Sequence, residues 1–187
     1  MKLLWVSLLV FAADLFTKQI VRIKMSLGQS ISVLGDELLR WTYIENPGMA
    51  FGIDPGNKLL FSIFTVGIVI WLCYYFWSVR NETLKLRIPL AIILGGAFGN
   101  LFDRLFYGIW FQQDGFLHGR VVDFIDFDIP NIDMLGIHMN RWPVFNIADV
   151  AVSCGVIALI ILYRPEENKP QESVAATADS ETENSNS

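Results

Sequence analysis

The chain has 187 residues, of which 53% are hydrophobic and 18% are charged, and its mean hydropathy is +0.42. This composition is too apolar for an ordinary soluble domain and predicts a membrane protein. The formal charge of −5 comes from residues 165–187, which carry six acidic residues and one lysine, whereas the rest of the chain has thirteen basic and thirteen acidic residues and no basic patch that would predict nucleic-acid binding.

Four apolar segments are long enough to enter or cross a bilayer, which takes about 20 helical residues. They cover residues 3–21, 59–79, 88–106 and 146–163. The first also resembles the start of a cleavable signal peptide, but its apolar run continues beyond Ala12-Ala13-Asp14, a poor cleavage site. We expect an all-α membrane protein, a four-transmembrane-helix bundle whose single domain covers residues 1–164, followed by a disordered acidic tail over residues 165–187.

Asp14 and Lys18 lie four residues apart in the first segment, so they share one face of the predicted helix. An ionisable group inside a membrane helix is costly, and opposite charges at this spacing neutralise each other. We interpret the two residues as a structural ion pair that orients the helix.

The first long loop, residues 22–57, contains a strand signal and a turn. Leu38–Tyr43 partly alternates apolar and polar residues, which indicates a strand. Asn46-Pro47-Gly48 is a turn signal, and the small and aromatic residues after it suit a packed or substrate-facing edge. The second apolar segment then carries no charge, and we expect Pro89 to start the next helix.

The third segment combines small residues with polar ones. Gly95 and Gly99 are spaced for the close approach of another helix. Asn100, Asp103 and Arg104 follow at helical spacing, which places them on one face. Such groups can simply reach the membrane interface, but a face beside a glycine seam points into the bundle. We therefore expect these three residues to form or support a site.

Two further carboxylates lie in the second half of the chain. The second long loop, residues 107–145, holds Asp123 in an apolar run, and Asp149 lies about one turn inside the fourth segment. Asn146 is a good N-cap residue, so it can form a capping box with Asp149. In a membrane helix the same position places an acid just below the interface, where an ionisable group indicates a functional site.

The second loop also carries both histidines, His118 and His138, and several aspartates. None of them has the HExxH, CxxC or EF-hand spacing of a metal site. We expect no metal and no other cofactor, and we interpret both histidines as exposed loop residues.

Asp123 and Asp149, brought close together, would form an aspartic dyad. Two adjacent carboxylates do not both ionise readily, so one keeps a proton while the other stays charged. Such a pair can take a proton from water and deliver one to an amide leaving group. Because a helix N-terminus favours the charged form of Asp149, we expect Asp149 to start as the base and Asp123 as the acid. Arg104 can hold the dyad or a substrate carbonyl, and Asn46 and Asn100 can donate hydrogen bonds.

Other functions have less support. Ser62 and Ser153 lie in apolar segments, but no GxSxG motif occurs, and the base of a Ser–Lys pair, Lys18, is expected to be occupied by Asp14. A small membrane carrier with a polar pathway is the alternative from another class, although no internal repeat supports it. A non-enzymatic assembly protein is a third alternative, supported only by the glycine seam.

Four spans would place both termini on one side of the membrane. The short segments on that side carry basic residues, which predicts cytoplasmic termini. Asp123, Asp149 and the Asn100–Arg104 group would then lie near the extracytoplasmic face.

Five motifs in this order, spread over residues 14–155, resemble those of the lipoprotein signal peptidase family, also called signal peptidase II. They are Asp14-x-x-Thr17-Lys18, Asn46-Pro47-Gly48-Met49-Ala50-Phe51-Gly52, Gly95-Gly96-Ala97-x-Gly99-Asn100-x-x-Asp103-Arg104, Val121-Val122-Asp123-Phe124 and Phe145-Asn146-x-Ala148-Asp149.

The resemblance implies an aspartic endopeptidase of the bacterial inner membrane that removes the signal peptide of prolipoproteins by cleaving before a diacylglyceryl-modified cysteine. It implies a metal-free enzyme, a small extracytoplasmic β-structure from the first loop, and inhibition by globomycin-type peptides. Its partners would be lipid-modified prolipoproteins and membrane lipids, and we expect a monomer. By the resemblance, the catalytic pair is Asp123 and Asp149, the residues lining or supporting the site are Asn46, Gly48, Asn100, Arg104 and Asn146, and the structural residues are Asp14, Lys18 and Asp103.

Two features depart from the family pattern. The first-loop motif reads Asn-Pro-Gly-Met-Ala, where many members have Asn-x-Gly-Ala-Ala or Gly-Ala-Ser. The second loop is longer than usual, with extra residues around Trp110–Gly119 and Ile129–Arg141. The longer loop bears on the shape of any lid over the site and leaves the chemistry unchanged.

Overall fold

The computed structural model describes residues 3–35, 38–48, 58–111, 115–134 and 137–162, and of residues 130–134 and 137–140 it describes the backbone alone. The predicted acidic tail, residues 165–187, lies outside the described residues, as does the second half of the first-loop motif, residues 49–52.

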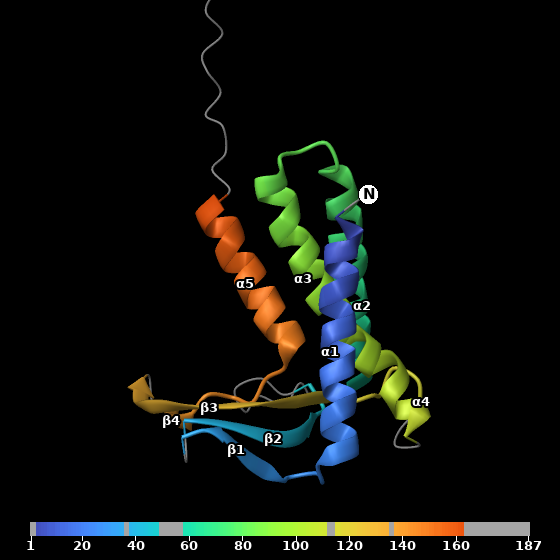
Figure 1. Ribbon diagram of the computed structural model, residues 1–187. Helices are drawn as coiled ribbons and strands as arrows, with labels where there is room; N and C mark the ends of the chain where they lie inside the picture. Colours follow the sequence, from blue (N-terminus) through green and yellow to red (C-terminus); the bar gives the residue numbers. More distant parts are fainter. Residues whose placement is uncertain (1–2, 36–37, 49–57, 112–114, 135–136, 163–187) are drawn as a thin grey trace, which may run out of the picture.

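Four long helices form a bundle (Figure 1): α1 (Leu4–Lys24), α2 (Lys58–Ser78), α3 (Leu84–Phe102) and α5 (Ile147–Leu162). α3 continues into a π-helical turn, η1 (Asp103–Tyr107), and the short α4 (Gly108–Trp110). α1 begins and α5 ends at the same end of the bundle.

Three helical stretches are long and apolar enough to cross a membrane, namely Leu4–Lys24, Lys58–Ser78 and Leu84–Trp110. They match the first three predicted spans. α5 is apolar but has only 16 described residues, a length of about 24 Å at the usual helical rise. The fourth span therefore stays a prediction, because a typical bilayer core is about 30 Å thick.

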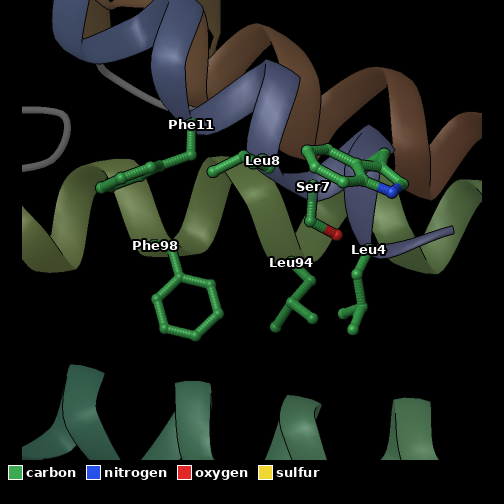
Figure 2. Close-up of a pocket in the computed structure, with 7 residues that line it drawn as sticks. Leu4, Ser7, Leu8, Phe11, Leu94 and Phe98 are labelled. Atoms are coloured by element: carbon green, nitrogen blue, oxygen red, sulfur yellow. The ribbon is translucent and has the colours of Figure 1, made fainter. Parts of the chain in front are cut away.

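α3 is the central helix of the bundle. In its most apolar stretch 56% of the residues are buried, against 11% in α2, so α2 presents most of its surface to the surroundings. The predicted glycine seam explains the close packing around α3. A Cβ built on Gly95 would lie 2.6 Å from the backbone oxygen of Ser7 in α1, and one built on Gly96 would collide with the backbone oxygen of Ala148 in α5. Figure 2 shows Ser7 of α1 beside Leu94 of α3.

The third helix starts earlier than expected. α3 begins at Leu84, and Pro89 lies inside it rather than at its start. Proline removes one hydrogen bond of the helix, the bond to the carbonyl four residues before it. That carbonyl belongs to Lys85, an exposed residue of the first turn. Water can satisfy it there, so the proline does not end the helix.

An antiparallel sheet lies across one end of the bundle (Figure 1), with strands β1 (Ser30–Leu34), β2 (Leu39–Asn46), β3 (Val121–Met134) and β4 (Ile137–Arg141) in that order. β2 confirms the strand predicted at Leu38–Tyr43. The expectation that residues 107–145 form a loop was wrong, because β3 and β4 occupy much of this segment and His138 lies in β4. The partner of β3 is β2, about 80 residues away, so local sequence does not reveal the pairing.

A small apolar core attaches the sheet to the bundle. Val21 and Met25 at the end of α1 pack with the buried residues Tyr43 of β2 and Val122 and Phe124 of β3. In β3, Asp123 stands between the last two, and neighbouring side chains of a strand point to opposite faces. The side chain of Asp123 therefore points to the opposite face of the strand, away from this core.

Candidate active site

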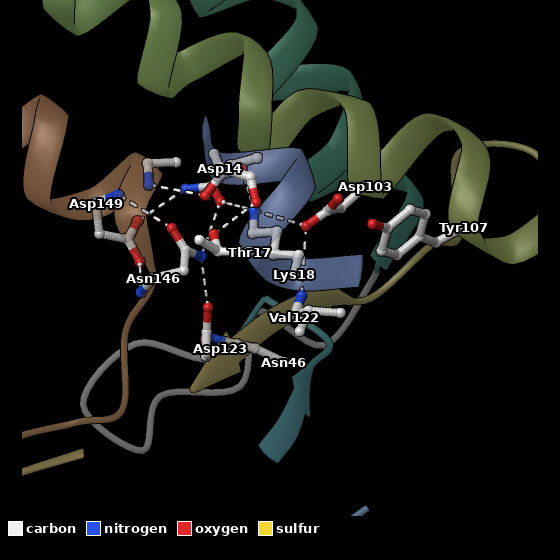
Figure 3. Close-up of polar contacts among 12 residues, drawn as sticks. Asp14, Thr17, Lys18, Asn46, Asp103, Tyr107, Val122, Asp123, Asn146 and Asp149 are labelled. Atoms are coloured by element: carbon white, nitrogen blue, oxygen red, sulfur yellow. Dashed lines mark hydrogen bonds and ion pairs between the residues drawn. The ribbon is translucent and has the colours of Figure 1, made fainter. Parts of the chain in front are cut away.

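Polar and charged side chains gather where the bundle meets the sheet (Figure 3). Buried charges need partners, because an unpaired charge costs several kcal/mol. Here the residues come from α1, β2, α3, η1, β3 and the start of α5, and nearly every one has a defined contact. The buried members of the group are Asp14, Lys18, Asp103, Arg104, Asp123 and Asn146.

Asp123 receives hydrogen bonds from two asparagine amides. Nδ2 of Asn146 donates to its Oδ1 over 2.6 Å, and Nδ2 of Asn46 donates to its Oδ2 over 3.0 Å. The side chain is 2% exposed. Burial, followed by the charge of Asp149, raises the pKa of Asp123 to about 7, although both amides act in the opposite direction. Asp123 can therefore hold a proton near neutral pH.

Asp149 forms the predicted capping box with Asn146. The backbone N–H of Asn146 donates to Asp149 Oδ2, and the backbone N–H of Asp149 donates to Asn146 Oδ1, each over 3.1 Å. Nδ2 of Asn100 also donates to Asp149 Oδ1 over 2.7 Å. The capping role and membership of the polar site thus coexist in one residue.

The predicted ion pair between Asp14 and Lys18 is present, with 2.7 Å between Nζ and Asp14 Oδ2. It belongs to a larger cluster, because Lys18 Nζ is also 2.8 Å from Asp103 Oδ2 and donates to Asn100 Oδ1 over 3.1 Å. The spacing of Asp14 and Lys18 reveals the first contact. The contact with Asp103 depends on how α1 packs on α3 and η1, so sequence reasoning missed it.

Asp14 and Asp103 also accept hydrogen bonds from the backbone. The N–H of Ala148 donates to Asp14 Oδ1 over 2.9 Å, and the N–H of Val122 donates to Asp103 Oδ2 over 3.3 Å. The first contact needs Gly99, because a Cβ there would collide with the carboxylate of Asp14. The glycine seam therefore makes room for a polar side chain as well as for helix packing.

Arg104 lies in η1, the π-helical turn that begins at Asp103. Its charge interacts with Asp123, Asp103 and Asp149. The guanidinium carbon of Arg104 lies 4.4 Å from the ring centroid of Phe61 in α2, a cation–π contact. Sequence reasoning treated α2 as scaffold and missed Phe61.

Gly48 lies against this cation–π pair. A Cβ built on Gly48 would lie 3.0 Å from the Phe61 ring and 3.4 Å from Arg104 Nη1. Its φ of +117° is one that other residues rarely adopt, and its N–H donates to Asn46 Oδ1 over 2.9 Å. Gly48 therefore fixes the amide of Asn46, whose nitrogen is directed at Asp123.

Sequence reasoning also missed the contacts of a second buried carboxylate of β3, Asp126. Asp126 accepts hydrogen bonds from Thr42 over 2.6 Å and from Arg141 Nε over 2.7 Å. Arg141 comes from the stretch Ile129–Arg141, expected as an extension of the second loop. Residues 129–134 and 137–141 of that stretch belong to β3 and β4. The ion pair joins β4 to Asp126 of β3, which also accepts from Thr42 of β2. Within the described residues, no group of three or more His, Cys, Asp or Glu side chains is arranged to hold a metal ion.

Comparison with known proteins identifies the family. Residues 6–164 match the sequence model of a family described as signal peptidase (SPase) II.

The chain belongs to the signal peptidase II family.

Members of this family are similar in sequence to this chain along most of their length. A lipoprotein signal peptidase of Pelodictyon phaeoclathratiforme is 38% identical over 179 residues, which are 93% of this chain and 95% of the relative. One of Halothermothrix orenii is 36% identical over 164 residues, which are 88% and 95% of the two chains. A bacterial membrane enzyme solved by the in meso method at 2.3 Å resolution superposes with a TM-score of 0.69 at 31% identity, covering 92% of this chain and 94% of its own. Membership of the signal peptidase II family confirms the expected enzyme class, a membrane peptidase.

Proposed function

We propose that this chain removes the signal peptide of bacterial prolipoproteins by hydrolysing the peptide bond before the diacylglyceryl-modified cysteine, with Asp123 and Asp149 as its catalytic dyad. The relatives at 32–38% identity are lipoprotein signal peptidases. The observation that carries the assignment of the dyad is Asn146, whose amide donates to Asp123 and whose backbone is paired with Asp149.

Asp149 acts as the base and Asp123 as the acid. Asp149 takes a proton from water as the water oxygen bonds to the scissile carbonyl carbon, and Asp123 gives its proton to the carbonyl oxygen. Asp149 then delivers its proton to the amide nitrogen while the C–N bond breaks and Asp123 recovers a proton from the collapsing intermediate. The products are a signal peptide with a free carboxylate and a protein that begins with the lipidated cysteine. The raised pKa of Asp123 supports the acid role, and no metal takes part.

The surrounding residues have three roles in this proposal. Asn46, Asn100 and Asn146 hold the carboxylates by donating amide hydrogens. Gly48 and Arg104 form the wall next to Phe61, where the guanidinium can approach a substrate carbonyl. Asp14, Lys18 and Asp103 form the buried cluster behind the dyad.

We further propose that residues 1–164 form one domain of the bacterial inner membrane with four spans, the last being 146–163, and that the tail is disordered. The termini would be cytoplasmic and the dyad near the extracytoplasmic face. The common end of the bundle at which α1 begins and α5 ends supports the even number of spans. We expect the enzyme to work as a monomer in contact with membrane lipids and to bind globomycin-type peptides at the dyad.

The test is a cleavage assay in detergent or bilayers with EDTA present throughout. Two substrates are compared, a prolipoprotein carrying diacylglyceryl-cysteine and the same precursor with unmodified cysteine. We expect cleavage of the lipidated substrate alone, with the new N-terminus at the modified cysteine by mass spectrometry. Equal cleavage of both would contradict the substrate assignment, and loss of cleavage with EDTA would contradict a metal-free reaction. The topology is tested separately by cysteine accessibility of residues placed in the tail and in β1.

A further inference from the structure

Lys18 is fully buried, and its ammonium group contacts side-chain oxygens of three residues, two by ion pairs and one by a hydrogen bond (Figure 3). An ammonium group has three hydrogens to donate and no lone pair. Its partners are Asp14 Oδ2 at 2.7 Å, Asp103 Oδ2 at 2.8 Å and Asn100 Oδ1 at 3.1 Å. If Lys18 only neutralised Asp14, the contact with Asp14 would be sufficient, and the contacts with Asp103 and Asn100 would not be needed.

Each carboxylate that Lys18 binds holds the backbone next to one member of the dyad. Asp14 accepts from the N–H of Ala148, the residue before Asp149. Asp103 accepts from the N–H of Val122, the residue before Asp123. The two catalytic carboxylates lie on separate elements, α5 and β3. Their relative position therefore depends on a group that contacts the supports of both elements. Lys18 is such a group, because it contacts both Asp14 and Asp103.

The third partner connects Lys18 to Asp149 through a side chain. Asn100 Oδ1 accepts from Lys18 and, over 3.0 Å, from Asn146 Nδ2, which leaves Asn100 Nδ2 to donate to Asp149 Oδ1 over 2.7 Å. A reversed amide would set its NH₂ group against two donors and its oxygen against a carboxylate. Lys18 also polarises the amide, which strengthens its donation to Asp149.

We propose that Lys18 is the positioning residue of the dyad, acting through Asp14 and Asp103 on the backbone beside each catalytic aspartate and through Asn100 on Asp149 itself. This inference rests on the proposed function of Asp123 and Asp149.

The charge of Lys18 gives the proposal a readout in the pH profile. The charged groups around it are Asp14 of α1 and Asp103 of η1, with Asp123 of β3 and Asp149 of α5 beyond the intervening amides. Arg104 of η1 is a second cation that acts on Asp103, Asp123 and Asp149. A nearby cation favours the ionised form of a carboxylate. Lys18 opposes the effect of burial on the pKa of Asp123. Removing Lys18 should therefore raise the pKa of Asp123 further and move the alkaline limb of the pH profile of kcat/KM to higher pH.

The first variant is Lys18→Met, which keeps an unbranched side chain one heavy atom shorter and removes the charge. We expect kcat to fall on the order of 100-fold with a much smaller change in KM, because the reacting groups lose their alignment. The alkaline limb, which Asp123 sets, should move to higher pH. Arg22→Met is the matched control, because Arg22 is a cation one turn further along α1 that pairs with Glu45 over 3.5 Å. It should leave the pH profile unchanged.

Because Lys18→Met leaves two buried carboxylates without their cation, it can fail to fold. The variant Asp14→Asn/Lys18→Met/Asp103→Asn avoids this, since it is neutral and its new amides can still accept from Ala148 and Val122. We expect it to fold and to lose kcat as Lys18→Met does, because the donor to Asn100 is absent. Its pH profile should not move upward, because two anions are removed together with the cation.

A wild-type pH profile in folded Lys18→Met or a wild-type kcat in the neutral variant would overturn the proposal, and so would failure of the neutral variant to fold, because each result would make Lys18 a folding residue only. Asp123→Asn and Asp149→Asn are measured in the same assay. If these two variants keep activity, the proposed dyad itself fails. If they are inactive and Lys18→Met matches Arg22→Met, only the role of Lys18 fails.

Discussion

Asn146 donates a hydrogen bond from Nδ2 to Asp123 Oδ1 over 2.6 Å while its own side-chain oxygen caps the first turn of α5 by accepting from Asp149. One side chain thus joins a carboxylate on a strand to a carboxylate on a helix. Substitutions can separate the two roles of Asn146. The cap of α5 needs only a side-chain acceptor, whereas the bond to Asp123 needs a donor on a side chain long enough to reach it.

Asn146→Ser should reduce activity without unfolding the protein. Serine is a good N-cap, so α5 keeps its capping bond, but the shorter side chain no longer reaches Asp123 or Asn100. We expect kcat/KM to fall by roughly 100-fold, as for a misplaced catalytic group, with Tm close to that of the wild type. Asn146→Ala, which loses the cap as well, should in addition lower the stability by about 1 kcal/mol. Equal losses of Tm in Asn146→Ser and Asn146→Ala would contradict the claim that the cap and the bond to Asp123 are separable.

The pH profile of kcat/KM should show an alkaline limb with an apparent pKa of about 7, the value to which burial raises Asp123. Above that pH the acid has lost its proton. Nδ2 of Asn46 stabilises the ionised form of Asp123, so Asn46→Ala should raise this pKa further and move the alkaline limb upward. A downward move would show that the limb belongs to another group.

Stability should also depend on the titration of Asp123. Its pKa is raised from 3.8 to about 7 in the folded protein, so folded Asp123 binds its proton more tightly than the unfolded chain does. The resulting stability is fully present below the unfolded pKa and is lost as the pH rises through the folded value, by on the order of a few kcal/mol. Tm measured across this range should fall in the wild type and fall less in Asp123→Asn. Parallel curves would contradict this.

Gly99→Ala should be damaging, because the new Cβ would collide with the carboxylate of Asp14, which holds the N–H of Ala148. We expect a loss of about 1–3 kcal/mol from overpacking together with reduced activity. Gly67→Ala is the matched control. It is a helical glycine of α2 with nothing within 4 Å of the added Cβ, and it should be neutral or stabilise the helix by about 0.5–1 kcal/mol. Similar effects at both positions would show that space at Gly99 is not limiting.

Phe61→Leu should impair catalysis through Arg104. The ring lies 4.4 Å from the guanidinium carbon, and a desolvated cation–π contact contributes about 2 kcal/mol. We expect a drop in kcat/KM of roughly tenfold. Phe64→Leu, on the same helix with its side chain 64% exposed, serves as control and should keep wild-type activity. Equal activity of the two variants would remove Phe61 from the site.

The local part of this architecture was predictable from sequence, and the non-local part was not. The Asp14–Lys18 pair and the Asn146–Asp149 capping box each lie within one helical turn, so residue spacing alone determines them. The strand β3 gave no local signal of its partner β2.

The π-helical turn at Asp103 likewise has no sequence signature. Within it, Asp103 contacts Lys18 and Arg104 contacts Phe61. Phe61 itself looked like any other apolar residue of a membrane helix. Family resemblance supplied the candidate residues, but their connections depend on how α1, α3, β3 and α5 pack together.

The central claim is that Asp123 and Asp149 are both essential to a metal-free hydrolysis. The most direct measurement is cleavage of a diacylglyceryl-modified prolipoprotein, with EDTA present, by the wild type, Asp123→Asn, Asp149→Asn and the control Asp128→Asn. Asp128 lies on the same strand as Asp123 with its side chain 38% exposed. We expect turnover by the wild type and Asp128→Asn and none by the other two, all four proteins being folded. Residual turnover in both Asp123→Asn and Asp149→Asn would contradict the dyad.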